Sequence, residues 1–213
     1  AASTVAAIDQ AKFQESMPVI RENQAYDGLI GAINEAYRSP SATATRFYFV
    51  RHGESAGNQA KIYAGQTLDV DLTKKGEQDA LQAGQIVKAM QEQQGWTFDA
   101  VFSSTSLRAR RTAEIALSQT EQYNVAFQVD ARLMEKHIGR FDGKPMDEDY
   151  TRRTLRGEAE IDNLTNFWDK FVYKHDPDDH QEESLRQVFN RVAEFLLEKN
   201  DLKEFQGRNI FVG

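Results

Sequence analysis

The sequence contains no cysteine among its 213 residues. Disulfides, thiol nucleophiles and thiolate-bound metals are therefore all excluded. The absence of cysteine does not indicate whether the protein works in an oxidising or a reducing compartment. The chain begins AASTVAA without an initiator methionine, which fits either removal of a signal peptide or a trimmed start. A cytoplasmic location is slightly favoured, with export as the alternative.

Long apolar runs are also missing, since no run approaches the roughly 18 residues needed to cross a bilayer. Hydrophobic residues make up 40% and charged residues 28% of the chain, which excludes wholesale disorder. The length fits one compact domain. With a net charge of −7, we expect neither nucleic acid nor a membrane as a partner, so an anionic ligand must be held by specific arginines.

Apolar patterning divides the chain into two parts. Residues 1–45 combine interrupted helical spacing with a Ser/Thr/Pro tract, which predicts an N-terminal helical extension and linker. Residues 46–213 alternate between the predicted strands Arg46–Val50, Phe98–Ser104, Val125–Asp130 and Asn209–Gly213 and the predicted helices Lys74–Met90, Ser106–Leu117 and Ser184–Lys199. This alternation predicts an α/β fold, a three-layer sandwich with a mostly parallel central sheet flanked by helices.

Basic residues follow the first two predicted strands. Arg51, His52 and Gly53 come directly after the first strand, and Arg108 lies in the first turn of the helix after the second. Because ligands bind beyond the carboxyl ends of strands in open α/β sheets, these residues can face one pocket. Two guanidinium groups suit the oxygens of a phosphate, Gly53 allows close backbone approach, and a largely neutral His52 can attack phosphorus. Taken alone, RHG also fits a surface basic dipeptide followed by a turn glycine.

Several ordered motifs favour the phosphate interpretation. They are RHGES with Asn58, DLTKKGEQDA, SSTSLRARRTA, LMEKHIG and EESLRQVFNRV. Over about Arg46 to Gly213 they resemble the histidine phosphatase superfamily, in the branch that includes cofactor-dependent phosphoglycerate mutases and related phosphatases. The residues after RHG do not resemble the acid-phosphatase branch.

The resemblance implies roles for individual residues. His52 matches the histidine that becomes transiently phosphorylated, and Arg51 and Arg108 match the arginines that hold the phosphoryl oxygens. Asn58 matches a further residue of the phosphate pocket. Glu135 matches the acid that protonates the departing oxygen and later activates water, although it also fits a solvent-facing carboxylate.

Several positions depart from the mutase pattern. Ile138 stands where the mutases usually have tyrosine, and Glu182 stands where relatives often have glycine. Arg152 and Arg153 match mutase arginines that grip a carboxylate, but they come sooner after Glu135 than in the mutase pattern, so an exposed helical face is the alternative to substrate contact. Relatives follow their last buried strand with a His-Gly pair, whereas this sequence ends at Gly213. We therefore expect truncation at the C-terminal end, with a naturally degenerate protein as the alternative.

Two further polar segments have less specific interpretations. His175–Glu183 crowds two histidines with carboxylates as a metal site would, but a solvated acidic loop before a helix fits better. Ala109–Arg111 suggests a nucleic-acid contact, but a solvated basic face fits better on an acidic protein. We expect the chain to need neither a metal nor another cofactor.

Three functions follow from this sequence. The first is a metal-independent phosphatase that hydrolyses a small-molecule or peptide phosphomonoester through a phosphohistidine on His52. The second is a phosphoglycerate mutase-type phosphotransferase, which must keep water away from the same intermediate. The third is a phospholigand-binding protein with incomplete catalytic machinery.

Overall fold

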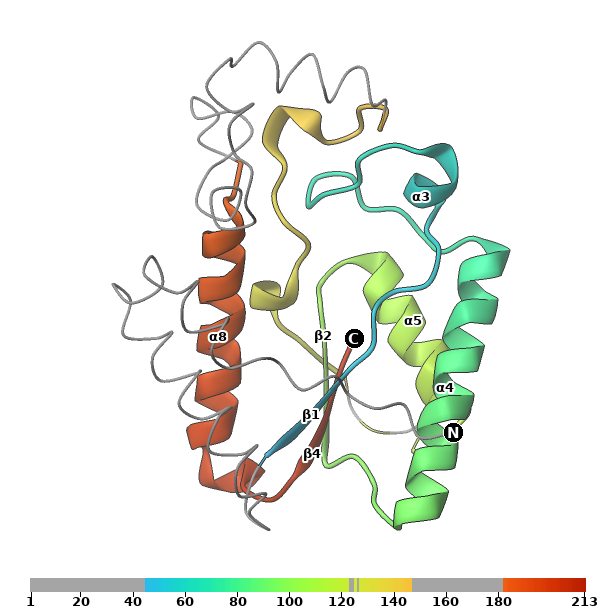
Figure 1. Cartoon of the computed structure of the whole chain (residues 1–213), viewed down its shortest axis with the longest axis vertical. Helices are drawn as coiled ribbons and strands as arrows, with labels where there is room; N and C mark the ends of the chain where they lie inside the picture. The colour runs from blue at the N-terminus through green and yellow to red at the C-terminus, as the bar shows by residue number, and fades with distance from the viewer. Residues whose placement is uncertain (1–44, 123–124, 126, 147–181) are drawn as a thin grey trace, which may run out of the picture.

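A parallel sheet lies at the centre of the molecule. The computed structural model describes residues 45–122, 125, 127–146 and 182–213. Its strands are β1 (Arg46–Phe49), β2 (Ala100–Ser103), β3 (Phe127–Val129) and β4 (Asn209–Val212). They are arranged in the order β1-β4-β2-β3, and every neighbouring pair is parallel (Figure 1). All carboxyl ends therefore lie at one edge of the sheet, where the sequence predicts the site.

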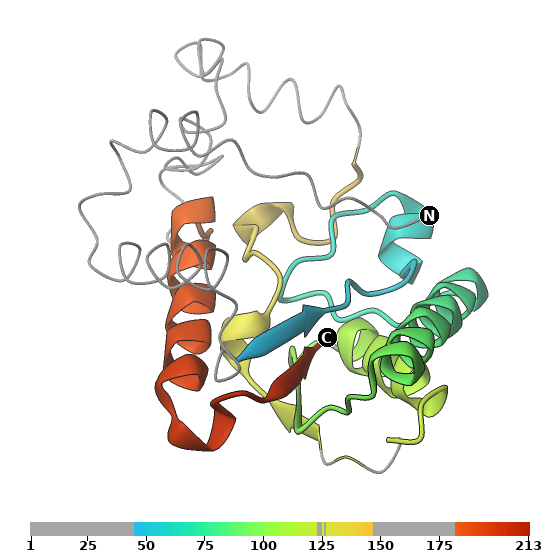
Figure 2. The same cartoon turned by 60° about the horizontal axis from the view of Figure 1, so that its bottom comes forward.

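Helices cover both faces of this sheet. The longer ones are α4 (Lys74–Gln94), α5 (Leu107–Ser118) and α8 (Leu185–Asp201), and the shorter elements are α3 (Ala56–Ala60), η1 (Ala131–Leu133), η2 (Gly139–Phe141) and η4 (Lys203–Phe205). α4 and α5 lie on one face, and α8 lies on the other (Figures 1 and 2). The predicted three-layer α/β sandwich with a parallel sheet is confirmed.

The two faces of the sheet belong to two separate apolar clusters. Val101 and Phe211 pack into a cluster that contains residues of α4 and α5, whereas Phe102 and Ile210 pack into one that contains Phe195 of α8. Successive strand residues point to opposite faces, so the continuous apolar runs of β2 and β4 fill both clusters. The strands are thereby fixed from both sides, and so is the edge where they end.

α4 shows why the helices begin and end where they do. Thr73 precedes the helix in an extended conformation, and its Oγ1 accepts a hydrogen bond from Gly76 N at 3.0 Å. Thr73 is therefore the N-terminal cap of α4. The helix continues past the predicted end at Met90 to Gln94, because Gly95 is the first residue to adopt a left-handed conformation, with φ of 67°.

Two further sequence predictions concern the N-terminal extension and membrane-spanning segments. The N-terminal extension predicted for residues 1–45 lies outside the described residues, apart from Thr45. In the part of the chain that the structure describes, no helix has the length and apolar character that a membrane span requires.

Candidate active site

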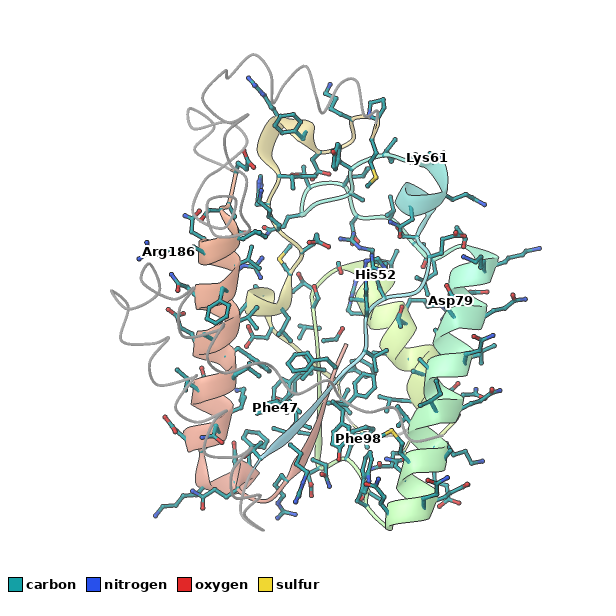
Figure 3. The ribbon with its side chains drawn as sticks, viewed as in Figure 1. Phe47, His52, Lys61, Asp79, Phe98 and Arg186 are labelled. Atoms are coloured by element: carbon teal, nitrogen blue, oxygen red, sulfur yellow. The ribbon has the colours of Figure 1, made fainter. Side chains whose placement is uncertain are left out.

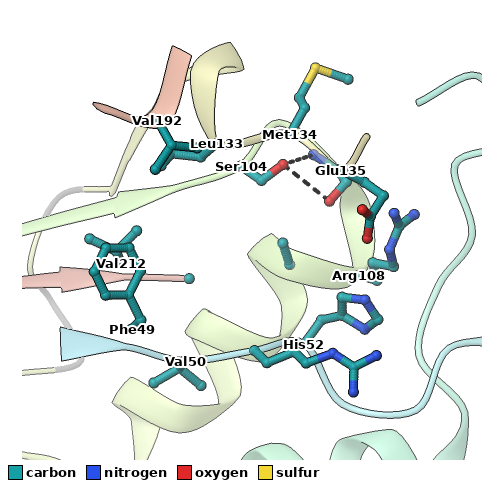
Figure 4. A pocket seen from close by; sticks show the side chains of 14 residues that line it. Phe49, Val50, His52, Ser104, Arg108, Leu133, Met134, Glu135, Val192 and Val212 are labelled. Atoms are coloured by element: carbon teal, nitrogen blue, oxygen red, sulfur yellow. Dashed lines mark hydrogen bonds between the residues drawn. The ribbon is translucent and has the colours of Figure 1, made fainter. Parts of the chain in front are cut away.

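A cavity of about 380 Å³ lies at the carboxyl edge of the sheet. Its charged and polar lining residues are Arg51, His52, Ser104, Ser106, Arg108 and Glu135. Its other lining residues are Phe49, Val50, Ala109, Leu133, Met134, Val192, Val212 and Gly213. Figure 3 shows His52 at this end of the sheet and Phe98 toward the other end, and Figure 4 shows the cavity from close by. Residues that the sequence predicts to follow two different strands therefore meet in one pocket.

His52 lies beyond the end of β1, and its imidazole is partly buried. Its Nδ1 is 2.8 Å from the carbonyl oxygen of Gly53. A carbonyl can only accept a hydrogen bond, so Nδ1 carries the hydrogen and Nε2 keeps its lone pair.

The electrostatic environment keeps this imidazole neutral. Burial is the largest influence and lowers the pKa of His52 below its usual value, and the charges of Arg108 and Arg51 lower it further. The hydrogen bond to Gly53 and the charge of Glu135 raise the pKa of His52 without reversing the shift. At pH 7 the ring is therefore mostly uncharged, and Nε2 can act as a nucleophile.

Arg108 is a buried arginine, with only 2% of its surface exposed. Its Nη2 donates to the carbonyl oxygens of Ala64 at 3.1 Å and Gly65 at 3.4 Å. Its Nη1 is also buried and has no hydrogen-bond partner in the described part of the chain. A buried donor without an acceptor costs about 1 to 3 kcal/mol, and an oxyanion in the adjoining cavity would supply that acceptor.

Arg51 is exposed and lies two residues after the end of β1. It lines the same cavity as Arg108. Among the described residues, its guanidinium has neither a hydrogen-bond nor an ion-pair partner. Two guanidinium groups, one buried and one exposed, thus border His52 and can share the oxygens of one phosphate.

Glu135 lies in an irregular segment between η1 and η2. Its carboxylate is exposed and lines the cavity, so it contacts both solvent and the pocket. Figure 4 shows the carboxyl group pointing toward Arg108 and His52. One carboxylate oxygen, Oε1, accepts a hydrogen bond from Lys136 N at 2.9 Å. The other oxygen can therefore give or take a proton at the cavity.

The sequence predicts that Gly53 allows the backbone to come close to a phosphate. In the structure, the close neighbour of Gly53 is the first turn of α4. A Cβ atom on Gly53 would overlap the backbone of Gly76, and one on Gly76 would overlap the backbone of Glu54. The N–H of Gly53 donates to Thr112 Oγ1 at 3.1 Å. This glycine therefore lets the RHG loop pack against the first turn of α4, and its N–H is already paired.

Thr112 is a site residue that the sequence does not reveal. Its hydroxyl is buried, donates to Arg108 O at 2.7 Å, and accepts from Gly53 N. One side chain thus joins the loop that carries His52 to the helix that carries Arg108. The helical spacing of the sequence shows only that Thr112 shares the buried face of α5, because a hydroxyl bonded to the carbonyl four residues earlier is common in helices.

Of the other predicted binding residues, only Asn58 is described, and the structure does not bring it into the cavity. Asn58 does not line it, and its Oδ1 accepts hydrogen bonds from Ser55 N at 3.1 Å and Ser55 Oγ at 3.0 Å in the capping box of α3. Arg152 and Arg153 lie outside the described residues.

Carboxylates and histidines do not gather into a metal site in the described ranges, where no group of three or more could hold an ion. Of the segment that suggested a metal, only Glu182 and Glu183 are described. These two carboxylates form ion pairs with Lys136 and Arg191 at 2.8 and 2.9 Å. Their charge is therefore matched by side chains of the protein.

Comparison with known proteins gives a family match over most of the chain. A family model described as the histidine phosphatase superfamily (branch 1) matches residues 47–212. The matched region contains every residue that lines the cavity except Gly213.

Individual relatives agree with this match. The 2,3-bisphosphoglycerate-dependent phosphoglycerate mutase of Streptococcus thermophilus is 30% identical over 186 residues, covering 79% of this chain and 77% of that protein. A phosphoglycerate mutase structure from Bacillus anthracis has a TM-score of 0.66 at 23% identity, covering 81% of this chain and 76% of that chain. A mycobacterial glucosyl-3-phosphoglycerate phosphatase solved with VO3 has a TM-score of 0.57 at 23% identity, covering 79% and 75% respectively. The two structural likenesses establish a common fold.

Proposed function

The chain belongs to branch 1 of the histidine phosphatase superfamily, and from this premise we propose that it is a phosphatase that hydrolyses a phosphomonoester through a phosphohistidine on His52. One observation carries the proposal. A neutral imidazole with a free Nε2 shares a cavity with Arg108, whose buried Nη1 has no partner in the described part of the chain. Transfer of a phosphoryl group needs this combination of a nucleophile and fixed N–H donors for the phosphoryl oxygens.

In the first step, Nε2 of His52 attacks phosphorus while Arg51 and Arg108 hold the non-bridging oxygens. A P–N bond forms, and the bond between phosphorus and the leaving oxygen breaks. Glu135 acts as the general acid in this step. It gives its proton to the leaving oxygen, so an alcohol departs instead of an alkoxide.

In the second step, the carboxylate of Glu135 takes a proton from water, and the water oxygen attacks the phosphohistidine. The P–N bond breaks, inorganic phosphate forms, and His52 returns to its neutral state. The exposure of Glu135 supports this step, since water reaches the carboxylate. Arg51 and Arg108 supply the positive charge that the transferring group needs, so the proposed steps use no metal.

A mutase-type phosphotransferase is the second candidate, and the name of the Streptococcus thermophilus relative favours it. Such an enzyme would use the same nucleophile but return the phosphoryl group to an organic hydroxyl. It would have to exclude water from the intermediate. The exposed positions of Arg51 and Glu135 favour hydrolysis over this alternative.

The test is to trap the phosphoenzyme with a radiolabelled aryl phosphate. We expect label that is lost in acid, retained in base, and found by mass spectrometry on the peptide that contains His52. His52→Ala should lose both label and turnover while keeping the circular dichroism spectrum and melting temperature of the wild type, because the imidazole lies outside both core clusters.

Each alternative has its own outcome in this experiment. Wild-type turnover in His52→Ala would contradict the nucleophile. Isomerisation of phosphoglycerate in the presence of 2,3-bisphosphoglycerate, without release of inorganic phosphate, would identify a mutase. Binding of vanadate with neither label nor turnover would identify a phospholigand-binding protein.

A further inference from the structure

The segment that carries Glu135 has no regular secondary structure of its own. Residues 134–138 connect η1 to η2 and run beside α8 (Figure 1). Two side chains donate to the carbonyl oxygen of Glu135: Gln66 Nε2, from the loop between α3 and α4, at 2.7 Å, and Arg191 Nη2, from α8, at 3.0 Å. The backbone of Glu135 is therefore held by side chains that are distant in sequence.

Glu183 connects these two donors. It forms a two-point ion pair with Arg191, with Nε at 2.9 Å from Oε1 and Nη2 at 3.0 Å from Oε2. Its Oε2 also accepts from Gln66 Nε2 at 3.1 Å and from His137 N at 2.8 Å. One carboxylate thus fixes both donors to Glu135 and also the amide two residues further on.

The charge on Glu183 is stabilised where it lies. Partial burial opposes ionisation, but the hydrogen bonds from Arg191 and His137 N outweigh it and hold the pKa of Glu183 below its usual value. A partly buried, two-point arginine pair is also geometrically specific. The ion pair therefore persists at neutral pH and can act as a rigid support.

Two outer contacts extend the support to either side of Glu135. Arg191 Nη1 donates to Arg132 O at 2.6 Å, and Lys136 Nζ donates to Glu182 Oε1 at 2.8 Å. Glu182 is only 1% exposed. This buried carboxylate thus adds a contact to the same segment.

We propose that Glu183, Arg191 and Gln66 are positioning residues, which hold the Glu135 carboxyl at the distance from the leaving oxygen that proton transfer requires. The inference rests on the proposed function, in which Glu135 is the general acid. Fixing its carbonyl sets the direction in which the side chain leaves the backbone. A misplacement of about 1 Å in a reacting group can lower the rate about a hundredfold.

The test compares two substrates, an alkyl phosphate whose leaving oxygen needs a proton and an aryl phosphate whose leaving oxygen does not. Gln66→Met removes one donor to Glu135 O and leaves the ion pair in place. We expect it to lower kcat/KM for the alkyl phosphate about tenfold, with a loss below threefold for the aryl phosphate. Arg191→Gln breaks the ion pair as well, and we expect about a hundredfold loss for the alkyl phosphate with the same preference.

Arg208→Gln is the matched control. This arginine also pairs with a carboxylate, Asp99 Oδ1 at 2.7 Å, but it precedes β4 at the opposite edge of the sheet. We expect both rates to stay within twofold of the wild type. If Arg191→Gln fails to fold, Gln66→Met decides the question.

A purely structural role would give equal losses on the two substrates, or none, and would overturn the inference. Coupling to Glu135 is tested by adding Arg191→Gln to Glu135→Gln, where we expect a further loss below twofold on the alkyl phosphate. If Glu135→Gln alone affects both substrates equally, the acid role in the proposed function fails, and the inference fails with it. If Glu135→Gln is selective but Gln66→Met and Arg191→Gln are not, only the inference fails.

Discussion

The two sides of the cavity are built in different ways. On the phosphate side, defined here as Arg51, His52 and Arg108, each residue follows a strand end or lies in the first turn of a helix. On the acid side, defined as residues 134–138 with Glu135, the backbone is irregular and side chains from distant elements hold it. Regular elements thus fix the proposed nucleophile and the proposed anion-binding groups, whereas a side-chain network fixes the proposed proton donor.

This difference predicts two kinetic signatures. Substitutions on the phosphate side change the nucleophile or the charge around phosphorus, so they should lower turnover of aryl and alkyl phosphates alike. Substitutions on the acid side change the delivery of a proton to the leaving oxygen, so they should spare kcat/KM of substrates with a good leaving group, although the second step, which is common to both substrates, also uses Glu135. Substrate pairs can therefore assign a residue to one side or the other.

After His52→Ala, which should abolish turnover, Arg108→Gln should have the largest effect on the phosphate side. The substitution removes a charge-assisted donor from the developing phosphoryl charge, which commonly costs about 2 to 4 kcal/mol. We expect kcat/KM to fall by a factor of about 30 to 1,000 on both substrates, measured at saturating and limiting substrate.

Arg111→Gln is the control on the same helix. This exposed arginine pairs with Glu77 at 3.6 Å and Glu114 at 3.7 Å and does not line the cavity. Its rates should stay within twofold of the wild type. A loss below threefold for Arg108→Gln, or a loss confined to the alkyl phosphate, would remove Arg108 from the phosphate side.

Thr112→Val should have the next largest effect, although Thr112 does not line the cavity. The substitution leaves the N–H of Gly53 buried without an acceptor, which should lower the free energy of unfolding by about 1 to 3 kcal/mol in urea denaturation. Because the loop of His52 then shifts relative to Arg108, we expect about a tenfold loss of kcat/KM on both substrates, or ~1.4 kcal/mol.

Thr112→Ser keeps the hydroxyl and should restore most of both quantities. Equal kinetics for the serine and valine variants would show that the hydroxyl does not connect the two elements of the phosphate side. A loss in Thr112→Val limited to the alkyl phosphate would place its influence on the acid side.

The phosphate side could be predicted from the sequence because the residues on either side of a strand end are enough to identify it. The apolar run before Arg51 and the start of the helix that contains Arg108 mark two strand ends, and parallel strands end at one edge. The order of the strands could not be predicted, because apolar patterning shows where strands lie but not that β4 is inserted between β1 and β2. The fold class was therefore predictable, and the detailed topology was not.

The acid side could be predicted only as far as Glu135 itself. Its supports lie far away in the sequence, with Arg191 56 residues later and Gln66 69 residues earlier. Gln, Glu and Arg are common on surfaces, so nothing in their local sequence separates a support from a solvated side chain. The same limit applies to Gly53, whose close approach was predictable but whose neighbour, the first turn of α4, was not.

The smallest expected effect is a shift in the pH dependence of kcat/KM, which separates the influences of Arg51 and Glu135 on His52. The charge of Arg51 disfavours the imidazolium form and so lowers the pKa of His52, whereas the charge of Glu135 raises it. Without the Arg51 charge, the imidazolium persists to higher pH. The acid limb of kcat/KM, which marks the loss of the neutral nucleophile as pH falls, should therefore move to higher pH in Arg51→Gln.

Arg51→Lys keeps the charge but not the two-point fork, so its rate should fall while its acid limb stays in place. Glu135→Gln, measured on the aryl phosphate, should move the limb to lower pH. An unshifted limb in Arg51→Gln at low ionic strength would show that the exposed guanidinium does not act on His52.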